Sequence, residues 1–114
     1  MSQAPHAHYN LETIGSVTVV HFNDHKIVSE VSDQLYALVE VAGHRQILLN
    51  FSRLTVLSSI AIAKLISLQK KVAGLQGRLK VCCVNPNLLE LLRYVGLDRY
   101  IEIYETQEDA LRTF

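Results

Sequence analysis

The fold is decided by residues 47–60, which read ILLNFSRLTVLSSI. A short apolar run from Ile47 to Phe51 is followed by a polar turn, and Ser58 and Ser59 then open a segment with helical periodicity. A helix start presents unpaired backbone N–H groups and the positive end of the helix dipole. A serine there can cap the helix, or it can carry a phosphate that the dipole helps to hold. The stretch therefore predicts a buried strand, a loop and a helix whose first serines are candidate regulatory positions.

The segments around this stretch alternate between strand and helix patterns. They predict a hairpin of strands 9–14 and 17–22, a helix over 31–42, a strand over 46–51, a helix over 58–74, a strand over 79–84, a short helix after Asn85-Pro86, a strand near 101–103 and a helix after Thr106. This alternation implies crossover connections and a mixed, mostly parallel sheet. We therefore predict one α/β domain of four to five strands and about four helices over residues 9–114, preceded by a flexible terminus of residues 1–8.

The overall composition is typical of a globular domain. Of 114 residues, 49% are hydrophobic and 19% are charged, which is too apolar for a disordered chain. The formal net charge is zero, so long-range attraction draws the chain neither to nucleic acid nor to an anionic membrane. No apolar run has the length of a bilayer-spanning helix, and the N-terminus lacks the features of a signal peptide. We expect a cytoplasmic protein that binds no nucleic acid and does not insert into a membrane.

With these segments, the chain resembles the STAS domain family, the fold of bacterial anti-sigma factor antagonists. The resemblance runs from Tyr9 onward and is strongest over residues 47–59, where the family shows an apolar strand, a short loop and an Asp-Ser-Ser-Gly-like helix start. The other matching pieces are Asn85-Pro86, Val95-Gly96-Leu97, Ile103-Tyr104-Glu105-Thr106 and Asp109-Ala110-Leu111. Two positions depart from the family's pattern, since Leu57 replaces its acidic residue and Ile60 replaces its glycine.

The resemblance implies a partner-switching protein that is not an enzyme and needs no cofactor. In such systems the antagonist binds an anti-sigma factor that is also a serine kinase, and phosphorylation of the helix-start serine separates the two proteins. A serine phosphatase restores binding. Carried over by position, the phosphate acceptor is Ser58, with Ser59 beside it. A phosphate adds roughly two negative charges, which a helix N-terminus tolerates and an acidic or apolar partner surface does not.

The candidate partner-binding residues come from two segments, the loop before the first helix and the start of the helix after residue 57. They are Asn23, Asp24, His25, Leu57, Ser58, Ser59, Ile60 and Ala63. Each segment also has a plainer interpretation. Ser58 can be a simple N-cap that accepts a hydrogen bond from an N–H near Ala61, the loop can be merely solvated, and Ile60 can be a single exposed apolar residue.

The remaining polar residues predict no chemistry. His6 and His8 lack further ligands, so we expect no metal site. Cys82 and Cys83 are neighbours in a predicted strand, so their side chains should point to opposite faces as unbonded thiols. The lysines predicted to form a solvated face are Lys64, Lys70, Lys71 and Lys80. No nucleophile motif, paired carboxylates or phosphate-binding glycine loop is present, which makes an enzyme the least expected function.

Two alternatives to the switch stay open at the level of sequence. One is a STAS scaffold, without phosphorylation, in a larger signalling assembly, which the apolar residues Leu57 and Ile60 favour. The other is an accessory subunit of a transporter, a role that some members of the family fill. A homodimer is compatible with all three functions.

Overall fold

The computed structural model describes residues 8–27 and 29–114, which form five strands, four α-helices and one 3-10 turn. In chain order these are β1 (Tyr9–Ile14), β2 (Val17–Phe22), α1 (Ser29–Glu40), β3 (Gln46–Asn50), α2 (Ser59–Gly74), β4 (Arg78–Cys82), α3 (Pro86–Tyr94), the 3-10 turn η1 (Leu97–Arg99), β5 (Glu102–Tyr104) and α4 (Gln107–Leu111). After the β1–β2 hairpin, helices and strands alternate, as the sequence predicts.

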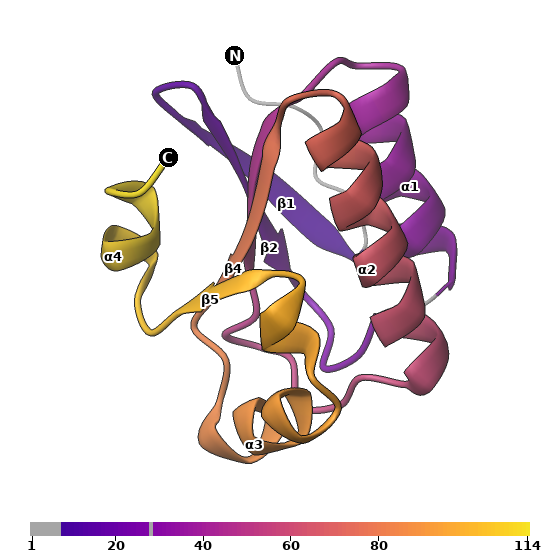
Figure 1. Ribbon diagram of the computed structural model, residues 1–114, viewed down its shortest axis with the longest axis vertical. Helices are drawn as coiled ribbons and strands as arrows, with labels where there is room; N and C mark the ends of the chain where they lie inside the picture. The colour runs from indigo at the N-terminus through magenta and orange to yellow at the C-terminus, as the bar shows by residue number, and fades with distance from the viewer. Residues whose placement is uncertain (1–7, 28) are drawn as a thin grey trace.

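The strands form one sheet in the order β1-β2-β3-β4-β5. Only the β1–β2 pair is antiparallel, and β2 through β5 run parallel. Figure 1 shows α1 and α2 side by side on one face of the sheet and α4 on the other, with α3 at the end of the sheet where β4 finishes. The predicted α/β class, with a mixed and mostly parallel sheet, is confirmed.

The central strand β3 is buried on both faces of the sheet. Ile47 and Leu49 pack into the larger core, beneath α1 and α2, whereas Leu48 packs into a smaller core with Ala110 of α4. Successive strand residues point to opposite faces, so a strand covered by helices on both sides must be apolar throughout. Burial on both faces therefore explains why the sequence of β3 contains a continuous apolar run.

The start of β1 is attached to the rest of the domain through His8. Its Nδ1 and Nε2 atoms lie 2.6 Å from Asp24 Oδ2 and 2.8 Å from Glu30 Oε1. The remaining residues of the flexible terminus predicted over 1–8, residues 1–7, lie outside the described part of the chain. The boundary between terminus and domain therefore stays a prediction.

Lys80 does not belong to a solvated face, and that prediction is wrong. The residue is only 3% exposed, because the end of the chain after α4 covers this part of β4. Its Nζ donates hydrogen bonds to the carbonyl oxygen of Thr113 at 2.9 Å and to Thr113 Oγ1 at 2.6 Å, and it lies 4.9 Å from the centre of the Phe114 ring. Tertiary contacts with the end of the chain decide the environment of this strand lysine.

The expected orientation of the two cysteines is also wrong. Cys82 ends β4, whereas Cys83 lies beyond the strand with a φ of +65°. Strand alternation does not hold there, and the two Sγ atoms lie 3.2 Å apart instead of on opposite faces. Both cysteines are free thiols, and burial is the main cause that raises the pKa of Cys82.

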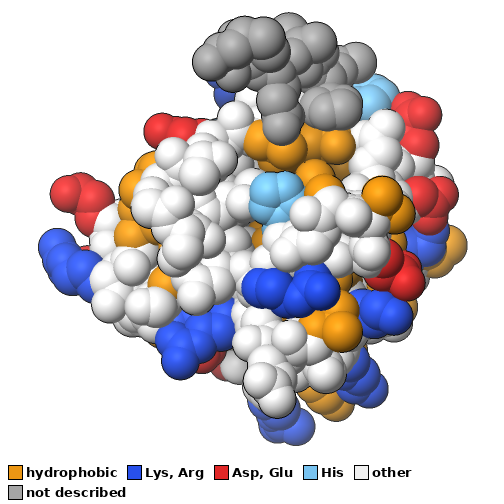
Figure 2. Space-filling model, turned by 90° about the horizontal axis from the view of Figure 1, so that it is seen from above, with side chains coloured by type: hydrophobic (Ala, Val, Ile, Leu, Met, Phe, Trp, Pro, Cys, Tyr) orange, Lys and Arg blue, Asp and Glu red, His pale blue; other side chains and the backbone are white. Residues whose placement is uncertain are grey.

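The charged side chains form no single-sign surface in the view from above. Figure 2 shows acidic and basic side chains interspersed on this face, with apolar side chains between them. Within residues 8–27 and 29–114, no helix has both the length and the apolar character that crossing a membrane requires.

We predict that Lys80→Ala lowers the free energy of unfolding by about 2 kcal/mol, because it removes a buried side chain and leaves its hydrogen-bond acceptors unpaired. Lys70→Ala, at an exposed position, should change the free energy by no more than about 0.5 kcal/mol. Urea denaturation of both variants measures the difference. Equal stabilities would show that the buried lysine contributes nothing to the fold.

Candidate functional site

Two loops meet at the end of the sheet where β2 and β3 finish. The backbone N–H groups of Thr55 and Val56 donate hydrogen bonds to the carbonyl oxygen of His25, at 2.9 and 3.2 Å. The loop before α1 and the loop before α2 therefore adjoin. These contacts bring the two predicted partner-binding segments together in one surface, which we call the switch surface, formed by His25, Val56, Ser58, Ser59, Ile60 and Ala63.

The loop before α2 is fixed from beneath by two leucines. Leu54 is fully buried and Leu57 is 5% exposed, and both pack into the larger core. Asn85, the N-cap of α3, donates a hydrogen bond from Nδ2 to the carbonyl oxygen of Leu54 at 2.8 Å. Because this loop is anchored on several sides, the first residue of α2 has a defined position.

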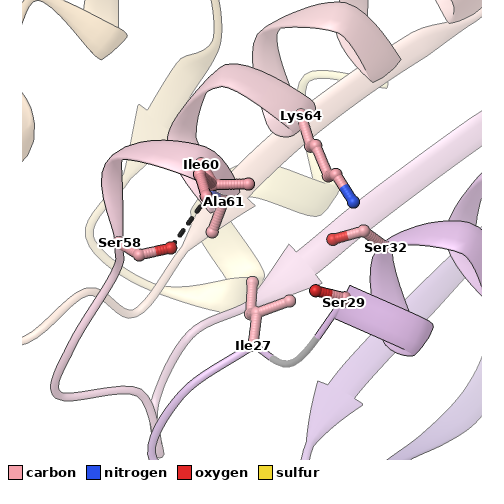
Figure 3. Close-up of a pocket in the computed structure, with 7 residues that line it drawn as sticks. All are labelled: Ile27, Ser29, Ser32, Ser58, Ile60, Ala61 and Lys64. Carbon is pink, nitrogen blue, oxygen red and sulfur yellow. Dashed lines mark hydrogen bonds between the residues drawn. The ribbon is translucent and has the colours of Figure 1, made fainter.

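Ser58 caps α2 as the sequence predicts. Its backbone is extended, with φ −73° and ψ 161°, and its Oγ accepts a hydrogen bond from the N–H of Ala61 at 3.1 Å (Figure 3). Ser58 and Ser59 are both exposed, so both serines face solvent at the helix start. The first turn of α2 contains no acidic residue, so no carboxylate of the helix's own first turn offsets the positive end of its dipole. The arrangement favours an added anion.

Exposed apolar side chains flank the two serines. Ile60 is 65% exposed and Val56 is 52% exposed, and Ala63 is exposed on the same helix. Val56 was missed by the sequence analysis, because nothing in the run from Leu54 to Leu57 shows which apolar residues face the core. Isolated exposed apolar residues are ordinary, but two beside an exposed helix start form a candidate contact surface.

Leu57 is not part of that surface. Its side chain lies in the core and is unavailable to a partner, so its inclusion among the contact residues is corrected here. The residue that replaces the family's acidic position therefore serves packing. The burial follows from the short loop, which must return the chain to the core before α2 begins.

The other predicted loop residues lie towards β1. Asp24 binds His8, and the backbone N–H of Asn23 donates a hydrogen bond to the carbonyl oxygen of His8 at 2.9 Å. The imidazole of His25 is exposed while its carbonyl binds the neighbouring loop. The backbone of His25 directly contacts the loop before α2.

A small cavity opens beside the start of α2, with a volume of about 90 Å³. Its lining residues, drawn in Figure 3, are Ile27, Ser29, Ser32, Ser58, Ile60, Ala61 and Lys64. Lys64 is half-buried at its edge, which differs from the solvated position predicted for it. The spacing of four residues from Ile60 does place Lys64 on the same helix face. The approach of α1, which supplies two of the serines, could not be read from that spacing.

We predict that Ser58→Ala lowers the free energy of unfolding by about 1 kcal/mol, because the N–H of Ala61 loses its acceptor. Ser59→Ala is the matched control and should change it by less than about 0.5 kcal/mol. Chemical denaturation of both variants tests this. A larger loss of stability in Ser59→Ala than in Ser58→Ala would show that Ser59, and not Ser58, caps the helix.

We predict that His8 titrates above its ordinary pKa, because the hydrogen bond with Asp24, and then that with Glu30, favours the charged imidazole. The stabilisation is complete below the unfolded-state pKa of about 6.5 and is lost as the pH rises through the higher folded-state pKa. NMR titration from about pH 5 to about pH 8 should show the pKa of His8 falling in Asp24→Asn. An unchanged pKa would exclude the pairing.

A family model described as the STAS domain matches residues 8–110. An anti-sigma factor antagonist from Mycobacterium paratuberculosis superimposes with a TM-score of 0.80 at 20% identity, covering 99% of this chain and 97% of that one. The Bacillus cell fate determinant SpoIIAA in its phosphorylated form superimposes with a TM-score of 0.68 at 17% identity, and the match covers 92% of this chain and 97% of that one. A sulfate transporter family protein from Wolinella succinogenes superimposes with a TM-score of 0.70 at 16% identity, and the match covers 90% of this chain and 87% of that one. These identities show a shared fold, and the family match over nearly the whole length shows that the chain belongs to the STAS domain family.

Proposed function

We propose that this chain is an anti-sigma factor antagonist that acts by partner switching. Its switch surface binds an anti-sigma factor that is also a serine kinase, and phosphorylation of Ser58 releases that partner. A serine phosphatase then resets the protein, and the cycle runs in the cytoplasm. The observation that carries the proposal is the pair of exposed serines at an uncompensated helix start, between the exposed apolar residues Val56 and Ile60.

The apolar side chains explain why one phosphate can decide binding. Val56 and Ile60 provide area that a partner can remove from water. A phosphate on Ser58 adds roughly two negative charges beside this area, and a partner would have to desolvate them on docking. The N-terminus of α2 stabilises the same charges in the free protein. Phosphorylation therefore weakens the complex without unfolding the domain.

The chemistry of the modification needs no residue of this chain beyond the acceptor. A catalytic base of the kinase takes the proton of the Ser58 hydroxyl as the Oγ–P bond forms. The bond between the γ-phosphorus of ATP and its bridging oxygen breaks, and ADP is left in the kinase. A phosphate oxygen can take over the N–H of Ala61 that the hydroxyl oxygen now accepts. Ser59, which begins α2 beside it, is the second candidate acceptor.

A scaffold in a larger assembly is the second candidate function. Exposed Ile60 and Val56 favour it, since permanent apolar contacts need no charge-dependent release. The likeness to a sulfate transporter family protein shows the fold alone, so the transporter role is the weaker alternative. Sensitivity of binding to charge at Ser58 separates the switch from both alternatives.

We predict that Ser58→Asp weakens binding to the purified anti-sigma factor of the same cell at least about tenfold, a loss of about 1.4 kcal/mol, whereas Ser58→Asn binds like the wild type. Asp and Asn both cap helices well and differ here in charge, so the pair isolates charge from helix stability. Isothermal titration calorimetry measures both affinities.

The same partner should add one phosphate to the wild-type chain in the presence of ATP, and none to Ser58→Ala, as read by intact-mass spectrometry. Equal affinities of Ser58→Asp and Ser58→Asn would reject the switch and favour the scaffold. If the added phosphate persists in Ser58→Ala but disappears in Ser59→Ala, the phosphate acceptor is Ser59.

A further inference from the structure

The cavity beside Ser58 lies where α1 and α2 approach each other near their first turns. Its volume of about 90 Å³ is roughly the volume that three water molecules occupy in liquid water. Figure 3 shows Ser29 and Ser32 of α1 on one side, Ser58 and Ile60 on the other, and Lys64 above. The space is large enough for a small polar group and too small for an apolar ligand of drug size.

Two of the polar groups that line this cavity, those of Ser32 and Lys64, have no bonding partner among the described residues. Ser32 is only 8% exposed, and within the described chain its hydroxyl has no hydrogen-bond partner. The ammonium group of Lys64 faces the hydroxyls of Ser29 and Ser32 in Figure 3, and among the described residues it forms no ion pair. The buried hydroxyl of Ser32 and the half-buried ammonium group of Lys64, both without partners among the described residues, favour an acceptor-rich anion.

The local charges also favour an anion. Among the described residues that line the cavity, Lys64 has the only charged side chain. Glu30, the acidic residue in the first turn of α1, is held by His8 at 2.8 Å instead of lining this space. The first turn of α2 carries no acidic side chain. An anion placed here therefore meets one cation, two hydroxyls and the positive end of the dipole of α2, with no carboxylate among the lining groups.

We propose that this cavity binds the phosphoryl group carried by Ser58, with Lys64, Ser29 and Ser32 as the donors. This inference rests on the proposed function, since it assigns the place where the phosphate is held. Ser58 borders the cavity already, so a group attached to its Oγ starts at the edge of this space. The three terminal oxygens of the phosphate then match three donor side chains, in place of about three waters.

Binding in this cavity gives the phosphorylated protein one defined state. The phosphate is fixed between α1 and α2, next to Ile60, rather than moving freely on the surface. An apolar partner surface approaching Ile60 would then meet an immobile dianion. The same contacts tie the first turns of the two helices together.

The test uses the full chain with phosphoserine installed at residue 58 by genetic-code expansion, so that no kinase or partner is needed. Phosphorus NMR follows the second ionisation of the phosphoserine, whose pKa is about 6 without a cation nearby. In the wild-type chain this pKa should be lower by about 0.5–1 unit, because Lys64 favours the dianion. Lys64→Gln should reduce the shift to the part that the dipole of α2 contributes, Ser32→Ala should reduce it less, and Lys70→Gln, on the exposed side of α2, should leave it unchanged.

The outcomes distinguish this inference from the proposed function. An equal phosphoserine pKa in the wild type and Lys64→Gln would overturn the cavity assignment, whether or not a kinase recognises the chain. Retention of the shift in Lys64→Arg would support a cationic donor at this place. A parallel experiment titrates the unmodified chain with inorganic phosphate. If the chain binds phosphate in a Lys64-dependent way while the pKa of the phosphoserine is not shifted, the cavity binds a free anion, and the proposal that it holds the phosphate of Ser58 is overturned.

Discussion

The burial of Leu54 and Leu57 is the constraint on which the switch surface depends. These two side chains pull the loop after β3 into the core, so the chain emerges at Ser58 with its N-cap geometry already set. A loop without such anchors would let the first turn of α2 fray, since a helix start has few hydrogen bonds of its own. The exposed serines are therefore presented by a rigid part of the domain.

That rigidity links the hydrophobic core to the electrostatics of the site. The larger core lies between the sheet and the pair α1 and α2, and the two helices pack against each other as well as against the strands. Their packing encloses the cavity beside Ser58, and the hydrogen bonds to His25 join the preceding loops. The anion-favouring character of this surface thus comes from the arrangement of elements, because the chain as a whole is neutral.

Local sequence signals predicted the elements because those signals act over a few residues. The hairpin bounds 9–14 and 17–22 match β1 and β2, and the caps at Ser58, Asn85 and Thr106 all accept the backbone N–H bonds that such caps provide. The cap of α2 was predicted down to its donor near Ala61. Each of these features depends on turn or cap residues and periodicity, which the sequence displays directly.

The features that could not be predicted arise between elements far apart in the chain. Lys80 is buried because the end of the chain after α4 covers it, and Lys64 borders a cavity because α1 brings Ser29 and Ser32 beside it. Helical or strand spacing contains no information about such neighbours. The assignment of Leu57 to the contact surface failed for the same reason, since its burial depends on how the loop crosses the core.

The two departures from the family's pattern make physical sense together. Leu57, in place of the family's acidic residue, is uncharged and buried, and its burial fixes the loop. Ile60, in place of the family's glycine, prevents a close approach to the backbone but adds exposed apolar area. Removing an acidic side chain next to the acceptor also removes a repulsion that a phosphate would meet at the helix start. In the proposed switch, Ile60 would strengthen the apolar contact of the unmodified state and the absence of a carboxylate at residue 57 would favour the charge of the modified one, as an exchange between two states requires.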